Sequence, residues 1–177
     1  MLKIVALNKE NMADWDASNT QFELTGRVVP SLKDGRWTIK EIPFETAKAT
    51  KFPAEKPDAS YLADPQKQLY FAYLDGKNVG QIRMFRNWNK FCYIENIAIQ
   101  AGHRHAGIGQ QLFDAAEKWA RDNKHVGLQL EAQDDNLNAC QFYQKQGMKL
   151  GGVDTLFYTA NPCLLYTSPS PRDRSLA

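Results

Sequence analysis

The feature that most constrains the fold is a change of hydrophobic period near Gly107. Before it, three consecutive segments are rich in aromatic and β-branched residues, at 69–74, 79–85 and 90–100. A turn built on Asp75-Gly76 separates the first two and extends to residue 78. After it, apolar residues recur at the spacing of one helix face to about residue 123: Ile108, Leu112, Ala116 and Trp119. The sequence therefore predicts an antiparallel meander followed by an amphipathic helix.

The N-terminal third is also rich in strand patterns. Residues 2–7 suit a short strand, and residues 21–30 alternate apolar with polar side chains until Pro30, where we expect the strand to stop. Asp34-Gly35 lies between two strand-like runs and predicts a hairpin. Residues 45–66 mix charged residues, proline and alanine, so we expect a surface loop or irregular helix. Such a segment could cover a site, and its role stays open.

The C-terminal part continues the alternation of strand and helix. The pattern predicts a strand at 126–132, a helix at 136–146 ended by Gly147, and a last strand region at 148–150 and 153–159. Strands and helices that alternate in this way place helices against a mixed sheet. The fold class predicted from the pattern is therefore α/β.

Composition narrows the classes of function. With 177 residues, 43% hydrophobic, the chain suits one globular domain. Its net charge of +2 is too balanced for a general attraction to nucleic acid or to a membrane surface. The three cysteines lack the spacing of disulfide scaffolds and metal sites, and no apolar run suits a signal peptide or a membrane span. We expect a cytoplasmic protein with no metal and a small-molecule partner, not nucleic acid or membrane.

The last fifteen residues differ abruptly in composition. Residues 163–177 are rich in serine, proline and arginine, and the run CLLYTSPSPRD resembles the translation of a synthetic transposon-end adapter. We expect the natural frame to end near Pro162, which gives a domain at 1–162 and a non-native tail at 163–177. A natural flexible tail is the alternative. Leu164 to Thr167 is strand-prone, so this segment is also predicted to pair as a last strand.

A glycine loop between a strand and a helix is the most informative local pattern. Residues 97–99 end a strand, and Gly107-Ile108-Gly109 opens the helix. Unpaired N–H groups of a first helical turn attract anions, and the missing side chains let a pyrophosphate approach the backbone. His103 to His105 add cationic or donor groups beside it. A simple helix-start loop is the alternative, because a lone glycine pair is a weak signal.

Two motifs strengthen the interpretation of this loop as an anion-binding site. Arg104 to Gly109 (RHAGIG) resembles the R/Q-x-x-G-x-G/A signature of the GNAT superfamily of acetyl-CoA-dependent N-acetyltransferases. Asn136 to Met148 (NLNACQFYQKQGM) is similar to the same superfamily's N-x-x-A-x-x-x-Y-x-x-x-G-F segment. The departures are His105, where glycine is common, Ala106, where a longer polar residue is common, and Met148 in place of phenylalanine.

A wider resemblance, to the streptothricin acetyltransferases within that superfamily, covers most of residues 20–160. It includes the segments Phe22 to Pro30, Arg86 to Lys90, Tyr93 to Glu95, Leu130 to Leu137 and Val153 to Thr155. It implies a mixed, mostly antiparallel sheet flanked by helices, and acetyl-CoA as cosubstrate. It also implies a cationic antibiotic as acceptor, acetylated at an amine of the β-lysine part of streptothricin, and hence antibiotic resistance.

The resemblance also implies residue roles. Tyr143 occupies the position of the general acid that protonates the CoA sulfur, with a packing tyrosine as the alternative. Asn136 would bind the pantetheine arm, and the backbone N–H of Ile99 or a near neighbour would hold the thioester carbonyl. The implied cofactor-binding set is Ile97, Ala98, Ile99, Arg104, His105, Ala106, Gly107, Ile108, Gly109, Gln110, Asn136, Ala139, Phe142 and Tyr143.

Glu95 is the candidate general base. It lies an even number of residues from Ile97 and Ile99, so alternation predicts that the three side chains share one face of the strand. From that face the carboxylate would take a proton from the acceptor ammonium, directly or through a water. A solvated strand carboxylate without a specific role is the alternative.

Acidic and aromatic side chains are candidates for binding a cationic acceptor, by charge and by cation–π contact. This predicted set comprises Glu95, Glu131, Asp134, Asp154, Trp88 and Tyr93, and for the aromatic residues a place in the core is the alternative. Cys92 and Cys140 suit small buried residues rather than nucleophiles, because no histidine lies at a recognisable spacing.

Two other functions stay open at this point. One is an acetyltransferase for another amine, such as an aminoglycoside, a polyamine or a protein lysine. The other is a CoA-binding sensor without turnover. The sequence leaves a monomer and a homodimer as alternatives, and it does not divide the work among the carboxylates.

Overall fold

The computed structural model describes residues 1–156, and the chain divides into two compact units. The first unit comprises Met1–Phe22 and Ala49–Glu131, and the second comprises Glu23–Lys48 and the residues from Ala132 onward. Among the described residues, none of the helices combines the length and the apolar character that a membrane span needs. The predicted strand pairing of residues 163–168 lies outside the described part of the chain.

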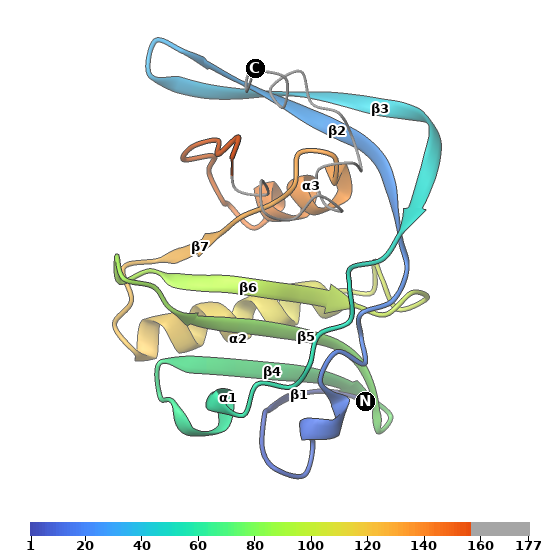
Figure 1. Ribbon diagram of the computed structural model, residues 1–177, viewed down its shortest axis with the longest axis vertical. Helices are drawn as coiled ribbons and strands as arrows, with labels where there is room; N and C mark the ends of the chain where they lie inside the picture. The colour runs from blue at the N-terminus through green and yellow to red at the C-terminus, as the bar shows by residue number, and fades with distance from the viewer. Residues whose placement is uncertain (157–177) are drawn as a thin grey trace. The chain divides into compact units, whose positions relative to one another are not determined.

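The first unit is built on a five-stranded sheet in the order β1-β4-β5-β6-β7. The strands are β1 (Leu2–Ala6), β4 (Lys67–Leu74), β5 (Lys77–Arg86), β6 (Cys92–Ile99) and β7 (Leu128–Leu130). Every neighbouring pair is antiparallel except β6 and β7, which run parallel. The predicted meander and the mixed, mostly antiparallel sheet are therefore confirmed (Figure 1).

The turn between β4 and β5 has the geometry that its sequence predicts. Asp75 and Gly76 have φ of +48° and +81°, as the two-residue turn that matches strand twist requires. The turn is shorter than expected, because β5 already begins at Lys77. Two residues are enough to reverse the chain once both adopt positive φ.

Helix α2 (Ile108–Asp122) covers one face of this sheet. The close contact of Gly80 with Leu112 identifies that face, so Gly80 and Ile82 point toward the helix and Gln81 and Arg83 point away from it. The buried core on this side includes Ile82, Met84, Leu112, Phe113 and Ala116. The predicted helix to about residue 123 is confirmed.

A second cluster lies on the face of the sheet that α2 does not cover. Trp15 and Tyr61 pack with Leu69 and Phe71. Trp15 follows the short 3-10 helix η1 (Met12–Asp14), and Tyr61 lies in the one-turn helix α1 (Ser60–Ala63). Helix α1 thus brings an aromatic side chain onto the sheet.

The second unit contains a long two-stranded ribbon of β2 (Phe22–Lys33) and β3 (Arg36–Thr50). Asp34 and Gly35, at φ of +49° and +72°, form the predicted hairpin turn. The expected end of the strand at Pro30 is wrong, because β2 continues to Lys33. Every second N–H of a ribbon strand points away from its partner, where proline is tolerated. The expected loop at 45–66 is also wrong at its start, since β3 runs to Thr50.

The same unit holds helix α3 (Leu137–Lys145), which confirms the predicted helix at 136–146. Gly147 follows it at φ of +80°, the usual conformation after a helix. The strand expected at 148–150 and at 153–156 is absent from the described residues. The run is three residues long and precedes Gly151-Gly152, which pack poorly in a sheet. Residues 157–159 lie outside the described range.

Candidate functional site

Strand β6 has an open edge. Its pairing with β7 ends at Ile94, opposite Leu130, whereas its pairing with β5 continues to Ile99. From Glu95 onward, therefore, β6 has a neighbouring strand on one side alone among the described residues. Backbone groups on the other side of this stretch are available to a ligand.

Hydrogen bonding fixes which groups face that edge. The N–H of Gln100 donates to the carbonyl of Val79 over 2.9 Å, toward β5. N–H groups alternate in direction along a strand, so those of Ala98 and Asn96 also point to β5. The N–H groups of Ile97 and Ile99 point to the open edge. This is the orientation that the predicted role of Ile99 requires.

The loop after β6 leads into an uncapped helix. Gly107 occupies the position before α2 at φ of +76° and provides no side-chain cap. The first N–H groups of α2, at Ile108, Gly109 and Gln110, have no partner one turn earlier in the helix, and with the helix dipole they attract an anion. The predicted phosphate-binding loop is thus brought to the end of the open edge of β6.

His105, in the same loop, has a φ of +63°. This left-handed conformation favours glycine, so the histidine departs from the residue that the backbone prefers here. The loop geometry tolerates a histidine because its side chain is exposed, as is that of neighbouring Ala106. The backbone N–H of His105 is retained.

Arg104 anchors this loop. Its Nε donates to the carbonyl of Ile99 over 3.1 Å, and its Nη2 donates to the carbonyl of Gln21 over 2.9 Å and to Oγ1 of Thr20 over 3.4 Å. The guanidinium therefore has acceptors within the protein. These bonds hold the backbone of the loop in place and engage the positive charge within the protein.

Glu95 lies at a β-bulge, which contradicts its predicted orientation. Arg83 is opposite Asn96 and Met84 is opposite Ile94, so Glu95 is the extra residue between them. A bulge interrupts alternation. The Glu95 carboxylate reaches Arg83, on the face away from α2, whereas Ile97, opposite Ile82, is on the face that α2 covers.

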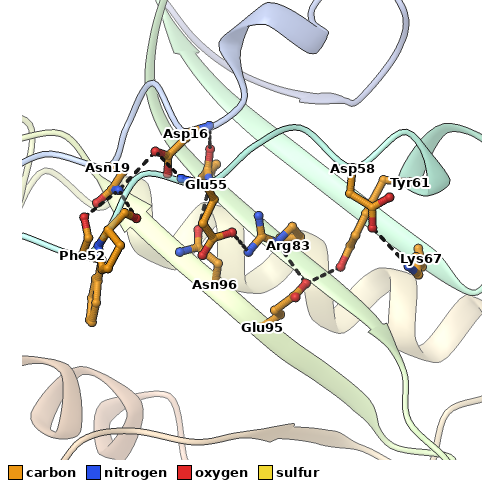
Figure 2. A network of polar contacts seen from close by, with 12 residues as sticks. Asp16, Asn19, Phe52, Glu55, Asp58, Tyr61, Lys67, Arg83, Glu95 and Asn96 are labelled. Atoms are coloured by element: carbon orange, nitrogen blue, oxygen red, sulfur yellow. Dashed lines mark hydrogen bonds and ion pairs between the residues drawn. The ribbon is translucent and has the colours of Figure 1, made fainter. Parts of the chain in front are cut away.

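The carboxylate of Glu95 has two donors (Figure 2). Oε2 accepts from Tyr61 Oη over 2.5 Å and from Arg83 Nε over 3.0 Å, and Arg83 also pairs with Glu55 through Nη2. Arg83 is 3% exposed, while Glu95 lies at the surface with Glu55. Sequence analysis missed Arg83, Tyr61 and Glu55. A charged residue within the apolar run 79–85 is a signal for a carboxylate partner, because a buried arginine needs one.

Two of the predicted acceptor-binding residues, Tyr93 and Glu131, belong to the first unit together with Glu95. Burial raises the pKa of Tyr93, and the charges of Glu131 and Glu95 add to this effect. Glu131 follows β7 directly, and Tyr93 packs against Phe85 with ring centroids 5.2 Å apart. Tyr93 thus lies near two carboxylates.

Trp88 is in a different position. It lies in the turn between β5 and β6 and is 90% exposed, so the alternative of a core residue is wrong for it. Asn87, in the same turn, donates from its backbone N–H to the carbonyl of Phe91 over 2.8 Å. The indole is thus held at the surface by an ordered turn.

The second unit contains the other predicted motif, on α3. Asn136 caps this helix, and its Oδ1 accepts from the N–H of Ala139 over 3.1 Å. The side-chain oxygen is thus engaged at the start of the helix. Tyr143 is half-buried and packs edge-on against Phe142 at 5.5 Å, and its backbone carbonyl accepts from Met148 at the helix end.

The carboxylates predicted for this unit have local partners. Asp134 pairs with Arg27, with Oδ2 2.5 Å from Nη2, so its charge is offset. Asp154 accepts from the N–H of Leu156 over 2.8 Å in an exposed turn. Neither arrangement resembles that of Glu95, because Glu95 and Glu55 together carry two negative charges and share the single positive charge of Arg83.

The two described cysteines are poor nucleophiles. Burial raises the pKa of Cys92 to about 12 and that of Cys140 to about 11. Cys92 is fully buried, and Cys140 is half-buried with its thiol 3.6 Å from the carbonyl of Gln133. The prediction that they are packing residues is confirmed for Cys92, and the raised pKa values argue against nucleophilic roles for both.

An open strand edge with a carboxylate at its start, followed by a glycine-initiated helix, forms a site that suits a phosphate-containing ligand. The model of the acetyltransferase (GNAT) family matches residues 30–148, and the chain belongs to this family.

Individual relatives are similar over nearly the whole chain. Streptothricin acetyltransferase A of Bacillus subtilis (strain 168) is 35% identical over 159 residues, which cover 90% of this chain and 92% of that protein. A Bacillus anthracis structure, assigned as a streptothricin acetyltransferase and in complex with acetyl coenzyme A, is 29% identical with a TM-score of 0.80, covering 90% and 91%. The crystal structure of nourseothricin acetyltransferase, at 24% identity, shares the fold with a TM-score of 0.75, covering 89% and 88%.

Proposed function

We propose that the protein is an acetyl-CoA-dependent N-acetyltransferase that acetylates an amine of the β-lysine part of streptothricin and so confers resistance to it. The observation that carries the proposal is the open edge of β6, with two outward N–H groups and the Glu95 carboxylate at its start. Similarity over 90% of the chain to streptothricin acetyltransferase A supports the choice of acceptor.

The residues present fit acetyl-CoA. The uncapped N–H groups of α2 suit its pyrophosphate, and the outward N–H groups of Ile97 and Ile99 suit an amide or thioester arm lying along the edge. Arg104 keeps the loop in the required conformation. When bound, acetyl-CoA supplies an acetyl group activated as a thioester.

The protein's own groups then move protons and hold charge. Glu95 takes a proton from the acceptor ammonium so that a neutral amine attacks. The N–H of Ile99 stabilises the negative charge that develops on the carbonyl oxygen. Tyr143, by its position in the second motif, gives a proton to the departing sulfur, and the amide nitrogen of Asn136 binds the pantetheine arm.

The acceptor is a polycation, and the charges near Glu95 suit it. Glu55 and Glu95 carry two negative charges around the single positive charge of Arg83, and Glu131 adds another beside Tyr93. Such a surplus of negative charge attracts a cationic ligand and steers it toward the site. Trp88 and Asp154 are proposed to contribute contacts, and Asp134 a smaller one because Arg27 offsets its charge.

Incubation of the purified protein with acetyl-CoA and streptothricin tests the proposal. We expect release of free thiol together with a mono-acetylated product by mass spectrometry. A panel of an aminoglycoside, a polyamine and a lysine peptide under the same conditions defines the acceptor. Turnover of one of these without turnover of streptothricin would refute the proposed acceptor, and acetyl-CoA binding without any product would support a sensor instead.

A further inference from the structure

Residues 45–66 were left without a role by the sequence, and the structure connects part of them to Glu95. This part is the segment 55–61, which contributes Glu55 and Tyr61 to the polar network on the sheet (Figure 2). Glu55 pairs with Arg83, and Tyr61 donates to Glu95. The segment thus reaches the proposed base at two points.

We propose that Tyr61 is a positioning residue for Glu95, which holds one carboxylate oxygen so that the other is presented to the acceptor amine. The inference rests on the proposed function, in which Glu95 is the general base. In this inference Tyr61 does not contact the substrate and acts through the Glu95 carboxylate alone.

Packing fixes the Tyr61 ring. The residue is 6% exposed, and its ring meets that of Trp15 edge-on with centroids 5.4 Å apart. Lys67 Nζ lies 5.1 Å above the same ring. Burial and the contacts with Trp15 and Lys67 restrict the side chain, so the hydroxyl oxygen has a defined position.

Arg83 fixes the same oxygen from the sheet. Its Cζ lies 4.8 Å from the Trp15 ring, and its Nε and Nη2 donate to Glu95 and Glu55. Both donors of Glu95 therefore converge on Oε2. Within residues 1–156, no described hydrogen bond ends on Oε1, which makes Oε1 the oxygen that accepts the proton.

The position of Glu95 in the strand explains why its side chain needs donors to fix its orientation. Glu95 is the bulged residue of β6 and the first one past the last pair with β7. Alternation along the strand does not determine where a bulged side chain points. Side-chain donors must determine it, and Tyr61 and Arg83 are those donors.

Tyr61 keeps its proton over the useful pH range. Burial raises the pKa of its hydroxyl well above the usual value, and the hydrogen bond to Glu95 raises it further. The charged and titratable groups around Glu95 are Tyr61 of α1, Arg83 of β5 and Tyr93 of its own strand. Beyond them, Glu55 pairs with Arg83, the charge of Asp58 acts on Tyr61, and the charge of Glu131 acts on Tyr93. Donors to a carboxylate favour its ionised form, so loss of one favours protonation.

The test compares Tyr61→Phe with Tyr73→Phe. Tyr73 also donates to a carboxylate in the first unit, that of Asp14, and its ring packs on the same aromatic cluster. For Tyr61→Phe we expect kcat with acetyl-CoA and streptothricin to fall about tenfold, with an unchanged KM for acetyl-CoA. The acidic limb of kcat/KM against pH should move to higher pH. Tyr73→Phe should keep the wild-type kcat and pH profile.

A double-mutant cycle with Glu95→Gln completes the experiment. If Tyr61 acts through Glu95, its removal adds little to the loss already present in Glu95→Gln. An unchanged pH profile and kcat in Tyr61→Phe, or a loss that is fully additive in the double variant, would overturn the inference and leave the proposed function standing. Wild-type protein that does not turn over streptothricin contradicts the proposed function, and the inference falls with it. Melting temperatures of all variants identify any general loss of folding.

Discussion

Arg104 donates a hydrogen bond from Nε to the carbonyl of Ile99 over 3.1 Å, and so closes the loop after β6 onto the end of that strand. The same residue, Ile99, directs its N–H to the open edge where a thioester carbonyl is proposed to bind. Backbone N–H and C=O of one strand residue point the same way, so the arginine anchors the peptide group next to the proposed oxyanion donor. Loop position and donor position are thereby linked.

Replacement of Arg104 by alanine should affect both the stability of the loop and the binding of acetyl-CoA. The variant loses hydrogen bonds to Ile99, Gln21 and Thr20, so we expect a free energy of unfolding lower by about 1–3 kcal/mol. The KM for acetyl-CoA should rise, which steady-state kinetics measures. Arg121→Ala removes an arginine that pairs with Glu117 on the exposed face of α2. It should change neither the free energy of unfolding nor the KM for acetyl-CoA noticeably.

Gly107→Ala tests the start of α2. Gly107 has a φ of +76°, and a Cβ there would meet open space, so backbone strain is the main consequence. We expect a loss of about 1–2 kcal/mol in the free energy of unfolding and weaker binding of acetyl-CoA by calorimetry. Gly151→Ala also places its Cβ in open space, but without a positive φ, and serves as the matched control. Equal effects of the two changes would contradict the proposed role of the left-handed turn.

His105→Gly should raise the stability of the protein, in contrast to Gly107→Ala. Relief of a left-handed conformation at φ of +63° is offset in part by the greater freedom of glycine in the unfolded chain. We expect a net gain of about 0.5–1 kcal/mol in chemical denaturation. His103→Gly, in the same loop but without a positive φ, should lower stability instead. A lower stability of His105→Gly would show that the imidazole makes a compensating contact.

The turns and the glycine loop were predictable because their determinants are local. Asp34-Gly35 and Asp75-Gly76 carry residues that tolerate positive φ, and both turns form where expected. The Gly107 turn follows from the same preference. By contrast, the continuation of β2 past Pro30 depends on which N–H groups face β3, and that depends on pairing across the ribbon.

The orientation of Glu95 was not predictable from alternation. The residue type and its even spacing from Ile97 and Ile99 suggested a base, but the bulge depends on the register between β5 and β6. Its partners Tyr61 and Arg83 are 34 and 12 residues away along the chain. Short-range patterns carry no signal for such contacts, although a buried arginine in an apolar strand indicates that a carboxylate is near.

The raised pKa values of the two described cysteines predict a pH dependence of labelling. With pKa values of about 12 for Cys92 and about 11 for Cys140, both thiols are almost entirely protonated below pH 9, and the thiolate fraction grows as pH rises toward those values. In a Cys163→Ser variant, iodoacetamide should label neither residue appreciably at pH 8, as measured by peptide mass spectrometry. Fast labelling of Cys140 at pH 8 would contradict its raised pKa.

Tyr143→Phe tests the proposed general acid. The change removes the hydroxyl and keeps the ring that packs against Phe142, so we expect helix α3 to keep its stability. A general acid contributes about 10²–10⁴-fold, so kcat should fall by a factor in that range while the KM for acetyl-CoA changes little. Tyr70→Phe removes the hydroxyl of a half-buried tyrosine of β4, which accepts from Gln68, and should leave kcat unchanged. If Tyr143→Phe retained the wild-type kcat, another group would have to protonate the sulfur.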